Sequence, residues 1–135
     1  MQMHERVDIN EIKKGLNSIA SLKNLTYSDI DKFGEKLGCL LVSSDVSSSQ
    51  LRKIHSIIKD VAFDIKSSNA SIDKIFLIPP RLAYIAGRQQ KAKEVCDLLS
   101  NIIRGKVKDK EDLSKLSELI DSILAYFVYY ERRKK

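Results

Sequence analysis

The apolar residues of this chain recur every three or four positions along almost its whole length of 135 residues. This spacing places them along one side of an α-helix, whereas a half-buried strand would alternate apolar and polar residues. No segment has the pattern of a strand, so we expect an all-α fold, a five- to six-helix bundle with short connections. The expected helical stretches cover about residues 7–23, 27–42, 48–66, 72–78, 80–104 and 110–132.

Two of the expected helix starts carry side chains that typically cap a helix. Thr26 precedes Asp29 by three residues, and Ser47 precedes Gln50 by the same distance. At this spacing a hydroxyl accepts a hydrogen bond from one of the first free backbone N–H groups of a helix. The serine-rich run 43–49 has almost no apolar pattern, so we expect a loop there and consider it a hinge candidate.

The segment PPRLAYIAGR at residues 79–88 combines a helix start, an apolar ladder and two arginines. We expect Pro79 to end the preceding turn, because the residue before a proline is disfavoured in the α region. Pro80 then suits the first position of the next helix. Gly87 is either a helix cap or a tolerated interior glycine, and we expect a break or kink around residues 87–90.

A chain of this length can bury a core without disulfides or metals, so we expect one helical domain over residues 1–135. Cys39 and Cys96 both lie among apolar residues, which is typical of buried thiols in a reducing cytosol. With only two histidines, the sequence predicts no metal site and no cofactor. It has no apolar signal core at the N-terminus and no apolar run of about 18 residues, so we expect a cytoplasmic protein without a membrane partner.

The positive charge of the chain is unevenly distributed. The formal net charge is +6, and most of the excess falls in residues 67–108, which hold eight Lys and Arg against three Asp and Glu. A charge concentrated on one or two helices is the usual signature of a polyanionic partner. A basic surface that binds nothing is the competing interpretation.

Helical spacing brings several of these cations together. Arg81, Arg88 and Lys91 can share a face if they lie on one helix, and Arg52 and Lys59 are seven residues apart on another. Arginine binds phosphate through a planar fork and stacks on bases, while lysine adds a point charge. The candidate RNA-binding residues are Arg52, Lys53, Lys59, Arg81, Arg88 and Lys91.

Catalytic motifs do not emerge from the sequence. Small α-helical ribonucleases of the HEPN type carry an arginine, four to six residues and then a histidine, but only two residues separate Arg52 from His55. Asp60 and Asp64 share a helix face, yet lysines flank them, and we interpret the pair as a solvated surface. We therefore expect a protein that is not an enzyme.

An aromatic cluster lies near the C-terminus. Phe127 and Tyr130 continue the apolar face of the last helix and are expected in the core. Tyr126 and Tyr129 then flank that face or lie at an interface. A platform on which bases stack is the alternative interpretation of this cluster.

Three segments together resemble a known family. SSSQLRKI at 47–54, PPRLAYIAGR at 79–88 and SILAYFVYYERRKK at 122–135 occur in this order. Each resembles the corresponding part of the small helical subunit of type III-A CRISPR interference complexes, the Csm complex. The similarity covers roughly residues 47–135, whereas residues 1–46 match no motif.

The resemblance implies a non-catalytic subunit that serves in antiviral defence. Such subunits stack as a short filament, contact other subunits, and line the channel that holds guide RNA paired with target RNA. The resemblance assigns the sequence-independent backbone contacts to Arg52, Arg81 and Arg88. The candidate lysines are added on helical geometry alone.

A protein–protein adaptor or oligomerisation module is the alternative, in which the basic face binds no nucleic acid. In one form of it, Arg88 caps backbone carbonyls at a break near Gly87. A subunit that stacks also exposes apolar surface, so we expect self-association in isolation, as a dimer, with the serine-rich run 43–49 permitting helix exchange.

Overall fold

The computed structural model describes residues 9–134, and within them all regular secondary structure is helical. The expected all-α bundle is confirmed. Six α-helices carry the fold: α1 (Ile9–Asn17), α2 (Tyr27–Ser43), α3 (Ser48–Ser67), α4 (Ile78–Arg88), α5 (Lys93–Lys106) and α6 (Lys110–Lys134). Three short 3-10 helices join them: η1 (Leu22–Asn24), η2 (Ile72–Leu77) and η3 (Gln90–Ala92).

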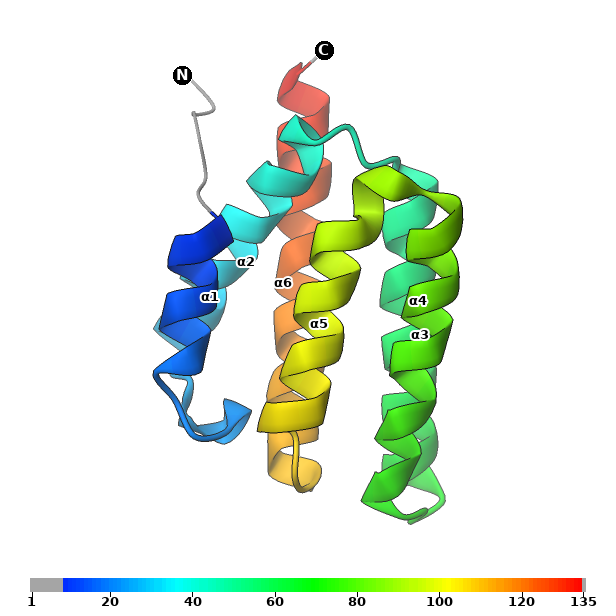
Figure 1. The fold of residues 1–135 in the computed structure, drawn as a ribbon. Helices are drawn as coiled ribbons and strands as arrows, with labels where there is room; N and C mark the ends of the chain where they lie inside the picture. The colour runs from blue at the N-terminus through cyan, green and yellow to red at the C-terminus, as the bar shows by residue number, and fades with distance from the viewer. Residues whose placement is uncertain (1–8, 135) are drawn as a thin grey trace.

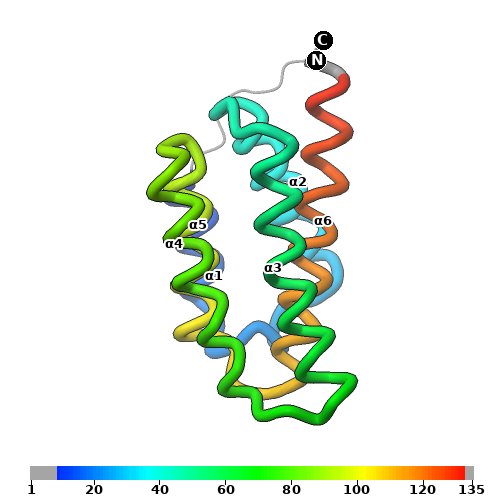
Figure 2. Tube along the Cα trace, turned by 90° about the vertical axis from the view of Figure 1, so that its right-hand side faces the viewer, coloured from blue at the N-terminus to red at the C-terminus, as the bar shows by residue number. Residues whose placement is uncertain are grey.

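The helices form two layers. Figure 1 shows the long α6 running through the bundle behind α5, with α2 on one side of it and α3 on the other. In the perpendicular view of Figure 2, α1, α4 and α5 lie on one side, and α2, α3 and α6 on the other. The most extensive packing joins α2 to α6, and α4 packs mainly on its neighbour α5.

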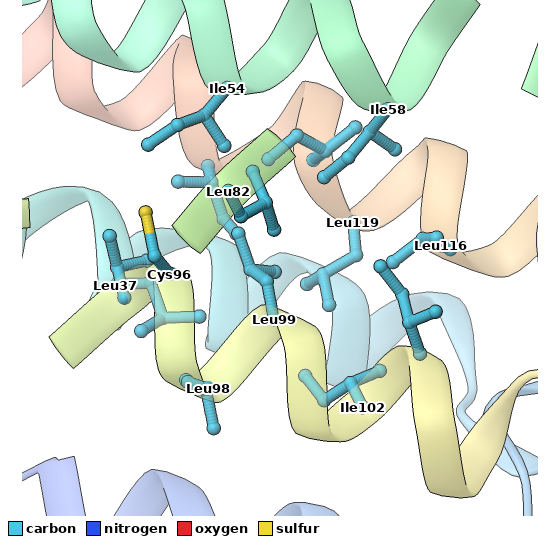
Figure 3. Packing of buried hydrophobic residues seen from close by; sticks show 14 of the residues in the cluster. Leu37, Ile54, Ile58, Leu82, Cys96, Leu98, Leu99, Ile102, Leu116 and Leu119 are labelled. Atoms are coloured by element: carbon cyan, nitrogen blue, oxygen red, sulfur yellow. The ribbon is translucent and has the colours of Figure 1, made fainter. Parts of the chain in front are cut away.

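The core fills the space between these layers. Figure 3 shows Leu82 and Leu99 from one layer meeting Ile54, Ile58 and Leu119 from the other. The side chains of Leu82, Leu99 and Leu119 are fully buried. Each such side chain contributes about 1.5–3 kcal/mol through removal of apolar surface from water. This apolar seam fixes α3 and α4 as neighbours.

The helices α2 and α6 approach closely because two glycines lie at their contact. A Cβ atom at Gly34 would lie 2.5 Å from the Cβ of Ser122. One at Gly38 would lie 2.8 Å from the backbone nitrogen of Phe127. Carbon atoms without a bond between them normally stay about 3.5–4.0 Å apart. Side chains at these two positions would therefore push the helices apart.

The first helix is shorter than its apolar pattern predicts. We expected a helix over 7–23, but α1 ends at Asn17, and residues 7 and 8 lie outside the described part. The Ser18 hydroxyl donates to the carbonyl of Gly15 at 2.7 Å, and Asn24 accepts from the backbone nitrogen of Ser21 at 3.2 Å. Such local side-chain bonds compete with helix continuation. The chain therefore turns and restarts as η1.

Pro79 does not end the preceding turn, and that prediction is wrong. Ile78 has helical angles (φ −73°, ψ −51°) and begins α4, so η2 runs directly into that helix. Both prolines lie in the first turn of α4. The N–H groups of a first turn have no partner within the helix, so a proline there removes no hydrogen bond.

The expected break around residues 87–90 is confirmed, but Gly87 does not cause it. Gly87 lies inside α4, and no described glycine has a positive φ. The helix ends at Arg88, and Gln89 is extended (φ −131°, ψ 96°). The chain resumes in η3 and then α5, which folds back along α4.

The capped starts are present. The Asp29 carboxylate accepts from the Thr26 backbone nitrogen at 3.0 Å, and the Thr26 hydroxyl accepts from the Asp29 nitrogen at 3.1 Å. The Ser47 hydroxyl likewise accepts from the Gln50 nitrogen at 3.1 Å. Between α2 and α3 the loop buries Val46, and its role as a hinge remains a prediction.

Candidate functional site

A groove lies between α3 and α4 on the outside of the bundle. Its volume is about 1200 Å³, larger than the roughly 300–1,000 Å³ typical of small-molecule pockets. The groove therefore has room for a segment of an extended ligand. It is lined by Ser49, Gln50, Arg52, Lys53, Ser56, Ile57, Asp60, Arg81, Tyr84, Ile85, Arg88 and Gln89.

Four of the six predicted cations meet in this groove. Arg52 and Lys53 come from α3, and Arg81 and Arg88 come from α4. Arg81 and Arg88 are seven residues apart, two turns of one helix, so they follow the same wall. The spacing within each helix and the packing of α3 beside α4 together bring the four cations to one groove.

These four cations are exposed and have no acidic partner. No ion pair among the described residues includes any of them, and Arg52 donates only to the hydroxyl of Ser48, at 3.3 Å. Asp60 is the only carboxylate on the groove lining. The groove therefore carries a net positive charge whose donors are available to an anion.

An exposed tyrosine stands on the α4 wall. Tyr84 is 66% exposed, and Arg88 donates from Nη1 to its hydroxyl at 3.3 Å. The guanidinium carbon of Arg88 lies 5.7 Å from the centre of the Tyr84 ring, which is cation–π distance. The half-buried Ile57 of α3 and the buried Ile85 of α4 add an apolar part to the groove lining.

Arg88 does not cap the end of its helix, so that form of the adaptor hypothesis is wrong. Its side chain bonds to Tyr84 rather than to a backbone carbonyl. The backbone itself bridges the break, since the Gln89 nitrogen donates to the carbonyl of Ile85 at 2.8 Å. The arginine is therefore not needed for the turn.

Lys59 lies outside the groove, on the side of α3 that faces α6. Its Nζ donates to the Ser117 hydroxyl at 2.7 Å and to the Asp121 carboxylate at 2.9 Å. His55 Nε2 lies 2.8 Å from the other oxygen of Asp121. Burial alone would raise the pKa of Asp121, but the bonds from His55 and Lys59 outweigh it and lower that pKa. This cluster ties α3 to α6.

Lys91 lies in η3, beyond the break at Gln89, and does not line the groove. The expectation that it shares a helix face with Arg81 and Arg88 is wrong, because α4 has already ended at Arg88. An RNA contact by Lys59 or Lys91 remains a prediction without support from this geometry.

The C-terminal aromatic residues serve the contact between α6 and α2. Phe127 and Tyr130 are buried, as expected. The Tyr130 hydroxyl donates to Glu35 at 2.6 Å, and the Tyr126 hydroxyl donates to Asp31 at 2.5 Å. These bonds, with smaller contributions from burial, raise the pKa of Tyr126 to about 12 and that of Tyr130 further.

Residues of other reactive types do not converge in the described part of the chain. No group of three or more His, Cys, Asp or Glu residues there could hold a metal ion. Cys39 and Cys96 are buried, and burial raises the pKa of the Cys96 thiol to about 11. Within residues 9–134, no helix is both long and apolar enough to cross a membrane.

Sequence reasoning missed the polar and aromatic lining of the groove. Gln50, Ser56 and Asp60 lie at helical spacing on the same side of α3 as Arg52 and Lys53. Tyr84 lies between the two arginines of its helix, so the same spacing would have placed it on the groove wall. The spacing of residues along α4 does not show that Tyr84 is exposed to solvent.

Fold and groove together define a small all-helical protein with an open, cationic groove built from two neighbouring helices. A family model described as Csm2 Type III-A matches residues 24–133, so the chain belongs to this family and is a subunit of a type III-A CRISPR complex. The searches of curated proteins and of solved structures gave no match. The matched region includes α3, α4 and the whole groove.

Proposed function

We propose that this chain is a non-catalytic subunit whose α3–α4 groove lines the channel for guide RNA paired with target RNA. The observation that carries the proposal is the convergence of Arg52, Lys53, Arg81 and Arg88 without acidic partners. Phosphates of an RNA backbone satisfy such donors in any sequence. The groove thus supports sequence-independent binding.

The non-catalytic part of the proposal is supported by the chemistry of the groove. Its lining offers cations, amides, hydroxyls and one carboxylate, without a histidine or cysteine that could act as base or nucleophile. The histidine nearest in sequence, His55, faces Asp121 of α6 instead. Metal-dependent RNA cleavage by the purified protein, lost in His55→Ala, would contradict this part of the proposal.

The test is the salt dependence of RNA binding by the full chain. Each lost phosphate contact reduces the slope of log affinity against log salt by about 0.7 for single strands and 0.9 for duplexes. Replacing two groove arginines, Arg81→Gln with Arg88→Gln, should therefore lower that slope by about 1.5 units. The matched control, Lys32→Gln with Lys36→Gln, removes the same charge from exposed positions on α2.

Equal slopes for wild type and the groove variant would rule out these contacts. Equal losses in the groove and control variants would instead indicate a general effect of net charge. Only a loss confined to the groove variant supports the proposal.

A protein–protein adaptor is the second candidate, favoured by exposed apolar residues at the η2 end of the bundle. Phe63 of α3 is 71% exposed, and Phe76 and Leu77 of η2 are 49% and 45% exposed. Large exposed apolar groups often mark contacts with other proteins. Self-association as a dimer, or stacking with the other subunits, would cover them. Light scattering over a concentration series should show dimers that Phe63→Ser weakens.

A further inference from the structure

The groove contains features that contacts to an RNA backbone do not require. Phosphate binding calls for cations and N–H donors, yet this groove also holds the exposed ring of Tyr84 and the apolar side chains of Ile57 and Ile85. The other exposed tyrosines of the described chain lie elsewhere, Tyr27 on α2 and Tyr129 on α6. An aromatic ring in a groove whose cations have no acidic partner is typical of a stacking platform for bases.

The ring of Tyr84 has two contacts with Arg88 on the same helix. Its hydroxyl accepts from Arg88 Nη1 at 3.3 Å, and the guanidinium lies within cation–π distance of the ring. Both groups stand one turn apart on the rigid helix α4. These contacts restrict the ring, which reduces the conformational entropy that it loses when a base stacks on it.

The remaining lining suits the edges of a base. Gln50 and Gln89 each offer an amide that donates and accepts, and Asp60 offers a carboxylate that accepts only. A carboxylate repels phosphate but accepts a hydrogen bond from an exocyclic amino group or a ribose hydroxyl. The arginines thus favour the phosphate of a nucleotide, and Asp60 favours its base or its ribose.

We propose that the groove takes an unpaired nucleotide, with its base stacked on Tyr84 and the neighbouring phosphates bound by Arg52 and Arg81. This inference deepens the proposed function and rests on it, because it adds an unpaired nucleotide to the paired RNA as a ligand of the same groove. The bases of an A-form duplex are already stacked and present only their edges and backbone. The face of Tyr84 therefore discriminates single-stranded from paired RNA.

The experiment compares a 12-nucleotide single strand with a 12-base-pair duplex, both fluorescently labelled, by anisotropy with the full chain. Tyr84→Leu should weaken single-strand binding by about 5- to 150-fold, the range that corresponds to one stacked base. Its duplex binding should be unchanged. Tyr84→Phe keeps the ring and should bind as wild type. The control Tyr27→Leu alters another exposed ring, 72% exposed on α2, and should have no effect.

A single strand carrying 2-aminopurine gives a second readout, because stacking quenches its fluorescence. Quenching by wild type that disappears in Tyr84→Leu supports the proposal. Unaltered quenching and affinity in Tyr84→Leu would overturn it, while the proposed function would stand if Arg81→Gln with Arg88→Gln still weakened binding. If neither variant changed binding, or wild type bound neither RNA, both would fail.

Discussion

The α2–α6 contact and the α3–α4 groove are both formed by pairs of neighbouring helices, but the kinds of side chain between the two helices differ. In the first pair, Gly34 and Gly38 allow α2 and α6 to approach closely, and tyrosine hydroxyls of α6 donate to carboxylates of α2. The second pair carries long cations that have no acidic partner. Glycines and hydrogen-bonded tyrosines leave no space between α2 and α6. Between α3 and α4, long cations without an acidic partner line an open groove.

The helix α3 repeats this contrast on its own two sides. Toward α6, Lys59 and His55 share the carboxylate of Asp121. Toward α4, Arg52 and Lys53 have no carboxylate to share. Cations on the same helix are therefore paired or left without a carboxylate according to the charge of the facing helix, and net charge alone does not distinguish the two.

Filling the α2–α6 contact should have the largest effect on stability. Gly38→Leu would force its side chain against the backbone of Phe127, and we expect a loss of about 3 kcal/mol in the free energy of unfolding. Urea denaturation measures it. The control is Gly87→Ala on α4, where a Cβ meets no atom within 4 Å. It should stabilise the protein by up to about 1 kcal/mol, and a loss there would contradict the open environment of Gly87.

Removing a tyrosine hydroxyl from the closed contact should have a smaller effect. Tyr130→Phe breaks the bond to Glu35 but keeps the buried ring, and we expect a loss of about 1 kcal/mol. Thermal unfolding followed by circular dichroism measures this. The same change in the groove, Tyr84→Phe, should be neutral because Tyr84 is exposed. Equal losses at both positions would mean that the two regions do not differ in this way.

Alkaline pH should weaken the closed contact without a mutation. The folded-state pKa of Tyr126 is raised to about 12, above its ordinary value of 10, so folding favours the protonated hydroxyl. This contribution is fully present below pH 10 and is lost as the pH rises from 10 through 12. Denaturant midpoints between pH 8 and 12 should fall less steeply in Tyr126→Phe than in wild type. Parallel curves would show that this hydroxyl does not contribute.

Removing cations from the open groove should have the smallest effect on stability. Arg81→Gln with Arg88→Gln should change the free energy of unfolding by less than about 0.5 kcal/mol, because both side chains are exposed and have no ion pair. Thermal unfolding is again the measurement. A large loss would favour the adaptor hypothesis, in which these arginines serve folding.

Periodicity in the sequence was sufficient for the fold class and for most helices, because the apolar stripe of each helix records which side it buries. It failed at the end of α1, where Ile19 continues the stripe but the hydroxyl of Ser18 bonds back to the helix. It also failed at Pro79, since sequence alone does not show that a proline will fall in a first turn. Local hydrogen bonds ended α1 early, whereas Pro79 is tolerated because it lies in the first turn of α4.

The candidate site was predictable within each helix but not between helices. Spacing brought Arg81 and Arg88 together, and the structure adds Arg52 and Lys53 from α3. Nothing in the spacing shows that Lys59 meets Asp121, a residue 62 positions later in the chain. Such pairings depend on which helices pack together, and that information lies in the tertiary fold.

The burial of the two cysteines gives each layer of the bundle its own reporter. Cys39 lies on α2 in one layer and Cys96 on α5 in the other, with 5% and 1% of their surfaces exposed. A thiol reagent reaches them only when that part of the core opens. Labelling rates resolved by peptide mass would therefore time the opening of the two layers separately. A cysteine introduced at the exposed Ser56 would react far faster and would place a probe in the groove alone.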